Sequence, residues 1–243
     1  MALKLLTLNI ENERHLTRVH AALVEHMPDI VRLQEVFEPD CAYLASSGGY
    51  SVKYAVSGRV QRGSGPERNW GVAVLSRVPL LRQSVSCYSE DSVIRLIREP
   101  NDPRRALVVT ELEHGGRPYR IITTHFTWTP NGEINDAQKA DFPRVKALLA
   151  RYPDYIFCGD FNAPRGREMF ARFVAELRLI DHLPANVAST LDPRFHKAIG
   201  LELVVDTVFS TSDYQVLDIR VLDDISDHKG ILARIERRIA PSP

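Results

Sequence analysis

The sequence predicts an α/β (α+β) fold in which mixed β-sheets pack together and helices lie outside them. Two observations favour this class: strand patterns outnumber helical patterns along the 243 residues, and hairpins alternate with helical crossovers. A doubly wound parallel sheet would instead alternate single strands with single helices. No internal repeat, low-complexity run or linker divides the chain, so we expect a single domain over residues 1–243.

In the first part of the chain, short apolar runs alternate with amphipathic segments. Apolar residues recur at helical spacing between Leu16 and Met27, and Pro28 helps to end this helix. Residues 58–68 are rich in Gly and Arg, which is typical of an exposed loop. The expected elements are strands at 3–9, 29–36, 50–57 and 70–77, and helices at 16–27 and 40–45.

The second part of the chain begins with a hairpin and ends with three strands. Residues 105–126 contain two β-rich runs joined through Gly115 and Gly116, which is typical of a β-hairpin. A helical pattern covers residues 136–151, although Pro143 interrupts it. The other expected elements are a strand at 154–159, a helix at 167–179, and strands at 201–210, 214–222 and 230–236.

The composition argues against several classes of protein. Thirty-one basic and 31 acidic side chains cancel, so no net charge draws the protein to nucleic acid or to a membrane surface. No apolar stretch approaches the ~20 residues that span a bilayer, and no signal-peptide cleavage site follows the N-terminus. Three cysteines without a CxxC pair argue against a disulfide framework or a zinc site and favour a cytoplasmic location. We expect a monomer without membrane insertion or an obligate protein partner.

Polar side chains recur at the ends of the predicted strands. These residues are Asn9, Glu35, His125, Asp160, Asn162, Asp206, Asp227 and His228. A strand end can hold a catalytic group rigidly and still leave it accessible to solvent. Each residue alone has an ordinary explanation, because Asn and Asp form turns, Asp227 can cap the next segment and His125 can be a core histidine. Their repetition favours a shared site.

Seven short motifs, in order along the chain, resemble those of the endonuclease/exonuclease/phosphatase superfamily, the DNase I-like metal-dependent phosphoesterases. The motifs are TLNI (7–10), LQEV (33–36), GVAVLSRVPL (71–80), TTHF (123–126), GDFNAP (159–164), VVDTVF (204–209) and SDHKGI (226–231). The resemblance implies a four-layer sandwich, in which two mixed β-sheets lie face to face with helices on both outer faces. It also implies a phosphoesterase site at one rim of the sandwich.

Phosphodiester hydrolysis requires a metal ion and hydrogen-bond donors for the charge that develops on the phosphate. Hard oxygen ligands suit Mg²⁺, with Mn²⁺ as a substitute, and Glu35 is the leading candidate ligand. Asn9 and Asp227 are the further metal candidates. His125 resembles a second family histidine that donates to the phosphate, and Glu67 is a candidate to support it.

The remaining catalytic candidates act on the water and the phosphate. The resemblance implies that His228 contacts the scissile phosphate or acts as the general base, while Asp206 orients its other ring nitrogen. Asp160 and Asn162 lie two residues apart and are expected to face the site together. Asp160 would orient or deprotonate the attacking water, and Asn162 would donate to the phosphate. The choice of base between Asp160 and His228 stays open.

DNA is the favoured substrate, because Arg and aromatic side chains near a phosphodiesterase site suit nucleic-acid backbones and stacked bases. The candidate substrate-binding residues are Arg68, Trp70, Trp128, Lys139 and Arg144, and residues 189–198 (STLDPRFHKA) are expected to form a substrate-side loop. Solvated surface charge is an equally ordinary explanation of the arginines. We therefore expect a nuclease or DNA-processing phosphodiesterase. The alternatives are an enzyme for an inositol phosphate or sphingomyelin-like head group, and an inactive binding scaffold.

Overall fold

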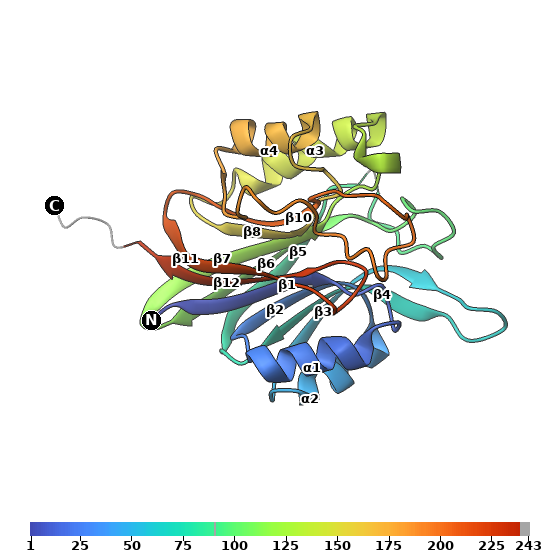
Figure 1. Ribbon diagram of the computed structural model, residues 1–243, viewed down its shortest axis with the longest axis horizontal. Coiled ribbons are helices and arrows are strands. Elements are labelled where there is room, and N and C mark those ends of the chain that lie inside the picture. Colours follow the sequence, from blue (N-terminus) through green and yellow to red (C-terminus); the bar gives the residue numbers. More distant parts are fainter. Residues whose placement is uncertain (90, 239–243) are drawn as a thin grey trace.

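The computed structural model describes residues 1–89 and 91–238, and within them two six-stranded β-sheets pack face to face. Helices α1 (Leu16–His26) and α2 (Cys41–Ser46) cover one outer face (Figure 1). Helices α3 (Asp136–Leu149) and α4 (Glu168–Leu177) cover the other outer face. This four-layer arrangement confirms the predicted fold class.

Each sheet joins strands that are distant in the sequence. The first sheet has the order β11-β12-β1-β2-β4-β3, and the second has the order β5-β6-β7-β8-β10-β9. The strands of the first sheet are β1 (Leu3–Asn9), β2 (Ile30–Phe37), β3 (Ser51–Val60), β4 (Arg68–Ser76), β11 (Tyr214–Leu222) and β12 (Gly230–Arg237). Those of the second are β5 (Leu80–Cys87), β6 (Ala106–His114), β7 (Arg117–His125), β8 (Ile156–Asp160), β9 (Ile180–Asp181) and β10 (Asp206–Ser210).

One parallel strand pair lies at the centre of each sheet. Strands β1 and β2 are parallel, as are β7 and β8, and a helix connects the strands of each pair. The predicted hairpin is present, because β6 and β7 are antiparallel and Gly115 and Gly116 both have positive φ in the turn. The carboxyl ends of parallel strands point the same way, so each central pair delivers two strand ends to one rim.

Apolar side chains fill all three spaces between the four layers. Leu5, Val72, Val108 and Ile121 are among those packed between the sheets. A second cluster joins the first sheet to α1 and α2, and a third joins the second sheet to α3 and α4. Among residues 1–89 and 91–238, no helix combines the length and apolar character needed to cross a membrane.

Several predicted boundaries differ from the structure, and strands β5 and β9 were not predicted. The strand expected at 201–210 begins only at Asp206, because the preceding segment leaves the sheet to pair with neighbouring loops. The helix expected at 136–151 ends at Leu149 and continues through the exposed Pro143. Strand β5 had no sequence prediction of its own, because it is a sheet edge with largely half-buried and exposed side chains and therefore lacks a strong apolar pattern.

Candidate active site

A cavity of about 320 Å³ opens at one rim of the sandwich and collects most of the polar strand-end residues. The predicted site residues that line it are Asn9, Glu35, His125, Trp128, Asp160, Asn162, Asp227 and His228. Asp206 lies behind His228, with its carboxylate 2.8 Å from Nδ1 of that ring. The cavity volume is at the lower end of the range for small-molecule sites.

Strand register in the second sheet brings three of these residues side by side. Asp160, at the end of β8, is paired with His125 on β7 and with Asp206 on β10. Gly159 permits this close approach, because it has φ +137° and a Cβ there would lie 2.1 Å from the Thr124 carbonyl oxygen. The backbone pairing therefore places two carboxylates and one imidazole at the same edge.

The GDFN segment after β8 is anchored by an aromatic side chain below the site. Phe161 is fully buried, and its ring centroid lies 4.8–5.2 Å from those of Phe157, Phe173 and Phe209. The main-chain N–H of Asn162 donates to Asp160 Oδ1 over 2.9 Å, which closes the turn above this ring. The residues that follow β8 are thus held in place by the packing of Phe161.

Glu35 reaches the cavity through an irregularity in β2. The pairing with β4 shifts between Leu33 and Val36, and Glu35 has φ +58°, which is unusual for a residue with a side chain. Gln34 stays in the core, where its Nε2 donates to the Thr123 hydroxyl over 3.3 Å. The bulge therefore holds one polar residue between the sheets and turns its neighbour towards the rim.

Asn9 connects the two sheets across the cavity floor. Its Nδ2 donates to Glu35 Oε1 over 3.2 Å and to Asp160 Oδ2 over 3.1 Å. Its Oδ1 accepts from the main-chain N–H of Glu11 over 3.2 Å. The amide group of Asn9 thus fixes the positions of two carboxylates on opposite sheets.

The cavity carries several carboxylates that a divalent cation would neutralise. Burial, together with the Asp227 and Asp160 carboxylates, raises the pKa of Glu35 to about 7 despite the hydrogen bond from Asn9. Burial, followed by the Asp206 carboxylate, raises the pKa of Asp160 to about 6. Such crowding of hard oxygen donors fits Mg²⁺ or Mn²⁺. The predicted ligands Glu35, Asn9 and Asp227 therefore have the donor chemistry for such an ion.

A second group of potential ligands lies deeper in the same site. Ligand atoms of Asp160, Asp206 and His228 all fall within 4.8 Å of one another. The contact between His228 Nδ1 and Asp206 already uses one nitrogen and one carboxylate oxygen, and Mg²⁺ prefers oxygen to imidazole nitrogen. We therefore assign the Asp206–His228 contact to hydrogen bonding and favour the Glu35 side of the cavity for a metal.

His228 and His125 face Asp160 from two sides with opposite electrostatics. Burial opposes the charged form of His228, but the Asp206 and Asp160 carboxylates raise its pKa well above the ordinary value. Burial, aided by Arg105 and His228, holds the pKa of His125 well below the ordinary value. The Nε2 atoms lie 4.0 Å (His228) and 3.5 Å (His125) from Asp160 Oδ2. One imidazole is therefore cationic and the other neutral at pH 7.

Four of the five predicted substrate-binding residues lie outside the cavity. Trp70 is buried against His125, with ring centroids 5.8 Å apart, and Arg68 stacks on the Phe37 ring at 3.8 Å. Lys139 is 3.6 Å from Asp136 on the exposed side of α3. Arg144 pairs with Asp141 and lines a second cavity of about 360 Å³. Trp128 alone of the five lines the active-site cavity, with 40% of its surface exposed.

Glu67, the candidate support for His125, is engaged elsewhere. Its carboxylate lies 2.6 Å from Arg59 Nη1 on the β3–β4 hairpin. Arg105 Nη1 donates to the main-chain carbonyl of His125 over 3.2 Å, whereas Nδ1 of the His125 ring has no hydrogen-bond partner among the described residues. Arg59 and Glu67 are eight positions apart in the sequence, and the β3–β4 hairpin brings their side chains together.

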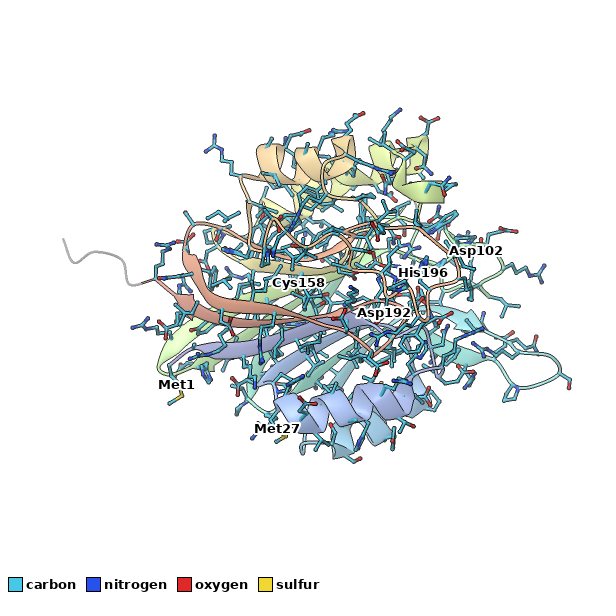
Figure 2. All side chains as sticks on the ribbon, in the orientation of Figure 1. Met1, Met27, Asp102, Cys158, Asp192 and His196 are labelled. Carbon is cyan, nitrogen blue, oxygen red and sulfur yellow. The ribbon has the colours of Figure 1, made fainter. Side chains whose placement is uncertain are left out.

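The loop expected on the substrate side does line the cavity and adds residues that were not predicted. Leu191, His196, Lys197 and Ala198 form its contribution. Leu201 and Leu203, which follow the loop, and Glu11, in the segment after β1, also line the cavity. Lys197 Nζ lies 2.8 Å from Glu11 Oε1. Figure 2 shows His196 and Asp192 of this loop away from Met1, towards the opposite end of the sandwich. An ENE sequence after a strand and an HK pair in a loop are too common to signal a site by themselves.

The model of the Endonuclease/Exonuclease/phosphatase family matches residues 6–228. An endonuclease/exonuclease/phosphatase family protein from Leptotrichia buccalis is 21% identical over 97% of this chain and 100% of its own, with a TM-score of 0.75. A Beutenbergia cavernae protein described in the same words is 19% identical over 97% and 72%, with a TM-score of 0.78. TDP2 from D. rerio, solved with a single-strand DNA product, is 17% identical over 97% and 99%, with a TM-score of 0.71. No curated protein matches the sequence at a significant level.

Proposed function

The chain belongs to the Endonuclease/Exonuclease/phosphatase family of hydrolytic phosphoesterases, and we propose that it cleaves phosphodiester bonds in nucleic acid with the help of a divalent metal ion. The observation that carries this proposal is the convergence on Asp160. Asn9 Nδ2, His125 Nε2 and His228 Nε2 lie 3.1, 3.5 and 4.0 Å from its Oδ2 atom. A buried carboxylate among these groups is suited to taking up a proton beside a bound phosphate.

Asp160 is the general base of the proposed reaction. With a pKa of about 6, it is mostly ionised above pH 7 and still basic enough to accept a proton from an attacking water. His228 carries a raised pKa and is therefore protonated, so it donates to a phosphate oxygen instead of accepting a proton. Asp206 holds His228 in this role through its Nδ1 contact. His125 and Asn162 line the same cavity and supply further donors.

Glu35 and Asp227 would hold Mg²⁺, with Mn²⁺ as a substitute. Asn9 fixes the Glu35 carboxylate through its Nδ2 and so orients the ligand. When bound, the ion would supply positive charge that neutralises the phosphate and polarises its P–O bonds. The raised pKa of Glu35 means that protons compete with the ion, so acidic solutions should weaken its binding.

The apolar part of the cavity lining favours a nucleoside as the group attached to the phosphate. Trp128, Leu201 and Leu203 provide apolar surface there. Lys197 is the one lysine or arginine among the described residues that line the cavity, and it is paired with Glu11. A second phosphate would meet carboxylates, whereas a base ring would meet apolar and aromatic surface. The single-strand DNA product in the similarly folded TDP2 supports this choice over an inositol polyphosphate.

A substrate panel tests the proposal. The panel contains single-stranded DNA, supercoiled plasmid, an inositol phosphate, sphingomyelin and bis(p-nitrophenyl) phosphate, each with Mg²⁺ and with EDTA. We expect Mg²⁺-dependent cleavage of DNA that is lost in Asp160→Asn and His228→Ala. Turnover of only the inositol phosphate or the lipid would overturn the nucleic-acid assignment. Undiminished activity in both variants would overturn the assigned site.

A further inference from the structure

The segment that carries His196 is joined to the segment that carries His228. Leu191 and His228 form an antiparallel bridge. On either side of it, the Asp192 N–H donates to the Asp227 carbonyl over 2.8 Å, and the Lys229 N–H donates to the Thr190 carbonyl over 2.7 Å. The substrate-side loop is therefore built onto the catalytic segment, and its position follows that of His228.

Asp192 makes the following turn rigid. Its carboxylate is buried and accepts from the N–H and guanidinium of Arg194 and from the N–H of Asp224. Its carbonyl oxygen accepts from the N–H groups of Phe195 and His196 over 3.1 and 2.9 Å. These bonds leave little freedom in the turn that ends at His196.

The Phe195 side chain fixes the turn against α1. The guanidinium of Arg18 lies 4.9 Å from the centre of the Phe195 ring, and the His15 ring centroid lies 5.0 Å from it. Lys197, on the other side of His196, is tied to Glu11. His196 is thus held between two anchored neighbours, as a group that contacts substrate needs to be.

The His196 ring faces the cavity with a defined tautomer. Its centroid lies 6.2 Å from that of His228, with the ring planes at 72°. The main-chain N–H of Ala198 donates to Nδ1 over 3.2 Å, so Nδ1 is the acceptor and the proton of the neutral ring is on Nε2. Nε2 lies on the far side of the ring from this bond. The ring therefore presents an N–H donor at Nε2.

We propose that His196 is a further catalytic residue, which donates its Nε2–H to an oxygen of the substrate phosphate beside His228. This inference rests on the proposed phosphodiesterase function. A fixed donor stabilises the charge that develops on phosphate oxygens more than a mobile water would. The Asn162 side chain, another donor that lines the cavity, is already engaged within the protein. Its Nδ2 donates to the Phe126 carbonyl over 3.0 Å.

Three substitutions at His196 separate a donor from a packing residue. In His196→Gln the amide nitrogen reaches the place of Nε2, in His196→Asn it reaches only the place of Nδ1, and in His196→Ala no donor is left. We expect His196→Ala and His196→Asn to lower kcat/KM for Mg²⁺-dependent hydrolysis of bis(p-nitrophenyl) phosphate by about 10- to 100-fold. We expect His196→Gln to recover most of that loss.

The matched control is Ile199→Ala. Ile199 directly follows the substrate-side loop, is 98% exposed and is not among the residues that line the cavity, so its variant should keep wild-type activity. The melting temperatures of all variants are compared, since a packing role for His196 would lower stability in step with activity. A His196→Ala enzyme within about twofold of wild type, or a His196→Gln enzyme as slow as His196→Asn, would overturn the proposal.

Calorimetric titration with inorganic phosphate tests the contact without turnover. We expect weaker phosphate binding in His196→Ala and His196→Asn than in the wild type and His196→Gln. Equal affinity in all four proteins would overturn the contact. If the wild type hydrolyses no phosphodiester, the proposed function fails, while the titration still decides whether His196 contacts a phosphate.

Discussion

The Nδ1 atom of His228 donates a 2.8 Å hydrogen bond to Oδ2 of Asp206, and both side chains are buried. The bond turns Nε2 of His228 towards the cavity and stabilises the imidazolium form. The second carboxylate oxygen of Asp206 has no hydrogen-bond partner within residues 1–89 and 91–238, so this carboxylate acts mainly on the histidine. The pair therefore sets both the orientation and the charge of the donor.

Replacing Asp206 by Asn should lower kcat by about 10²–10⁴-fold, because the amide no longer favours the imidazolium or its orientation. The raised pKa of His228 keeps the ring protonated to higher pH, so activity should fall at a lower pH in Asp206→Asn than in the wild type. A pH profile of kcat for both proteins measures this shift. Identical alkaline limbs would contradict the role of the pair.

The same bond predicts a pH dependence of stability. Because the pKa of His228 is raised in the folded protein, its stabilising contribution is complete below the unfolded value of about 6.5 and is lost as pH rises through the folded value. The free energy of unfolding of Asp206→Asn should therefore fall furthest below that of the wild type at pH 6 and approach it at high pH. Urea unfolding at pH 6, 8 and 10 provides the measurement.

Glu35→Gln should stabilise the metal-free protein at pH 8. Since burial raises the pKa of Glu35 to about 7, its contribution is complete below the unfolded value of 4.5 and is lost as pH rises through 7. At pH 8 in EDTA, removing the ionised carboxylate should raise the free energy of unfolding by about 1–3 kcal/mol. Glu67→Gln, at a surface pair, is the control and should change it by less than about 1 kcal/mol.

Mg²⁺ should make the wild type more stable than Glu35→Gln. Because Glu35 is the proposed ligand, Mg²⁺ at pH 8 should raise the melting temperature of the wild type and leave that of Glu35→Gln nearly unchanged. The wild-type effect should shrink at pH 5, where protons compete for the carboxylate. An equal Mg²⁺ effect in both proteins would show that the ion binds elsewhere.

Trp128→Ala should affect substrates that carry a base and spare those that do not. The Asn101 side chain donates to the Trp128 carbonyl and accepts from the Trp128 main-chain N–H, both over 3.0 Å. These bonds fix the main chain that carries the exposed indole. Loss of stacking on one base costs about 1–3 kcal/mol, so kcat/KM for thymidine 5′-(p-nitrophenyl phosphate) should fall about tenfold or more. Methyl p-nitrophenyl phosphate should react as before. Equal losses on both substrates would argue against stacking.

Phe161→Ala should be the most destabilising of these substitutions. The ring packs against Phe157, Phe173 and Phe209, and its removal leaves a cavity below Asp160. We expect a loss of about 3–5 kcal/mol in urea unfolding. Leu81→Ala, at a 68% exposed position, should change stability by less than about 0.5 kcal/mol. A loss below about 1 kcal/mol for Phe161→Ala would mean that the segment after β8 does not depend on this ring.

The strand ends were predictable because an apolar run that stops at a polar residue can be recognised in the sequence. Asn9, His125 and Asp160 end three such strands, whereas Glu35 lies at the bulge two residues before the end of β2. Parallel pairing of β1 with β2 and of β7 with β8 then makes these ends coincide in space. The basic residues were less predictable, because the charge of Lys139 or Arg144 does not say which way its helix face points.

By itself, the amino-acid sequence determined the fold class, the order of the main strands and helices, and the chemical types gathered at one rim. Periodicity and strand-end polarity are local properties, so they can be recognised in the amino-acid sequence. Only the tertiary structure decided that Arg144 lies outside the cavity, that Glu67 pairs with Arg59, and that His196 lies beside His228. These relations depend on strand register and on loops that pair with distant segments, which are properties of the packed chain.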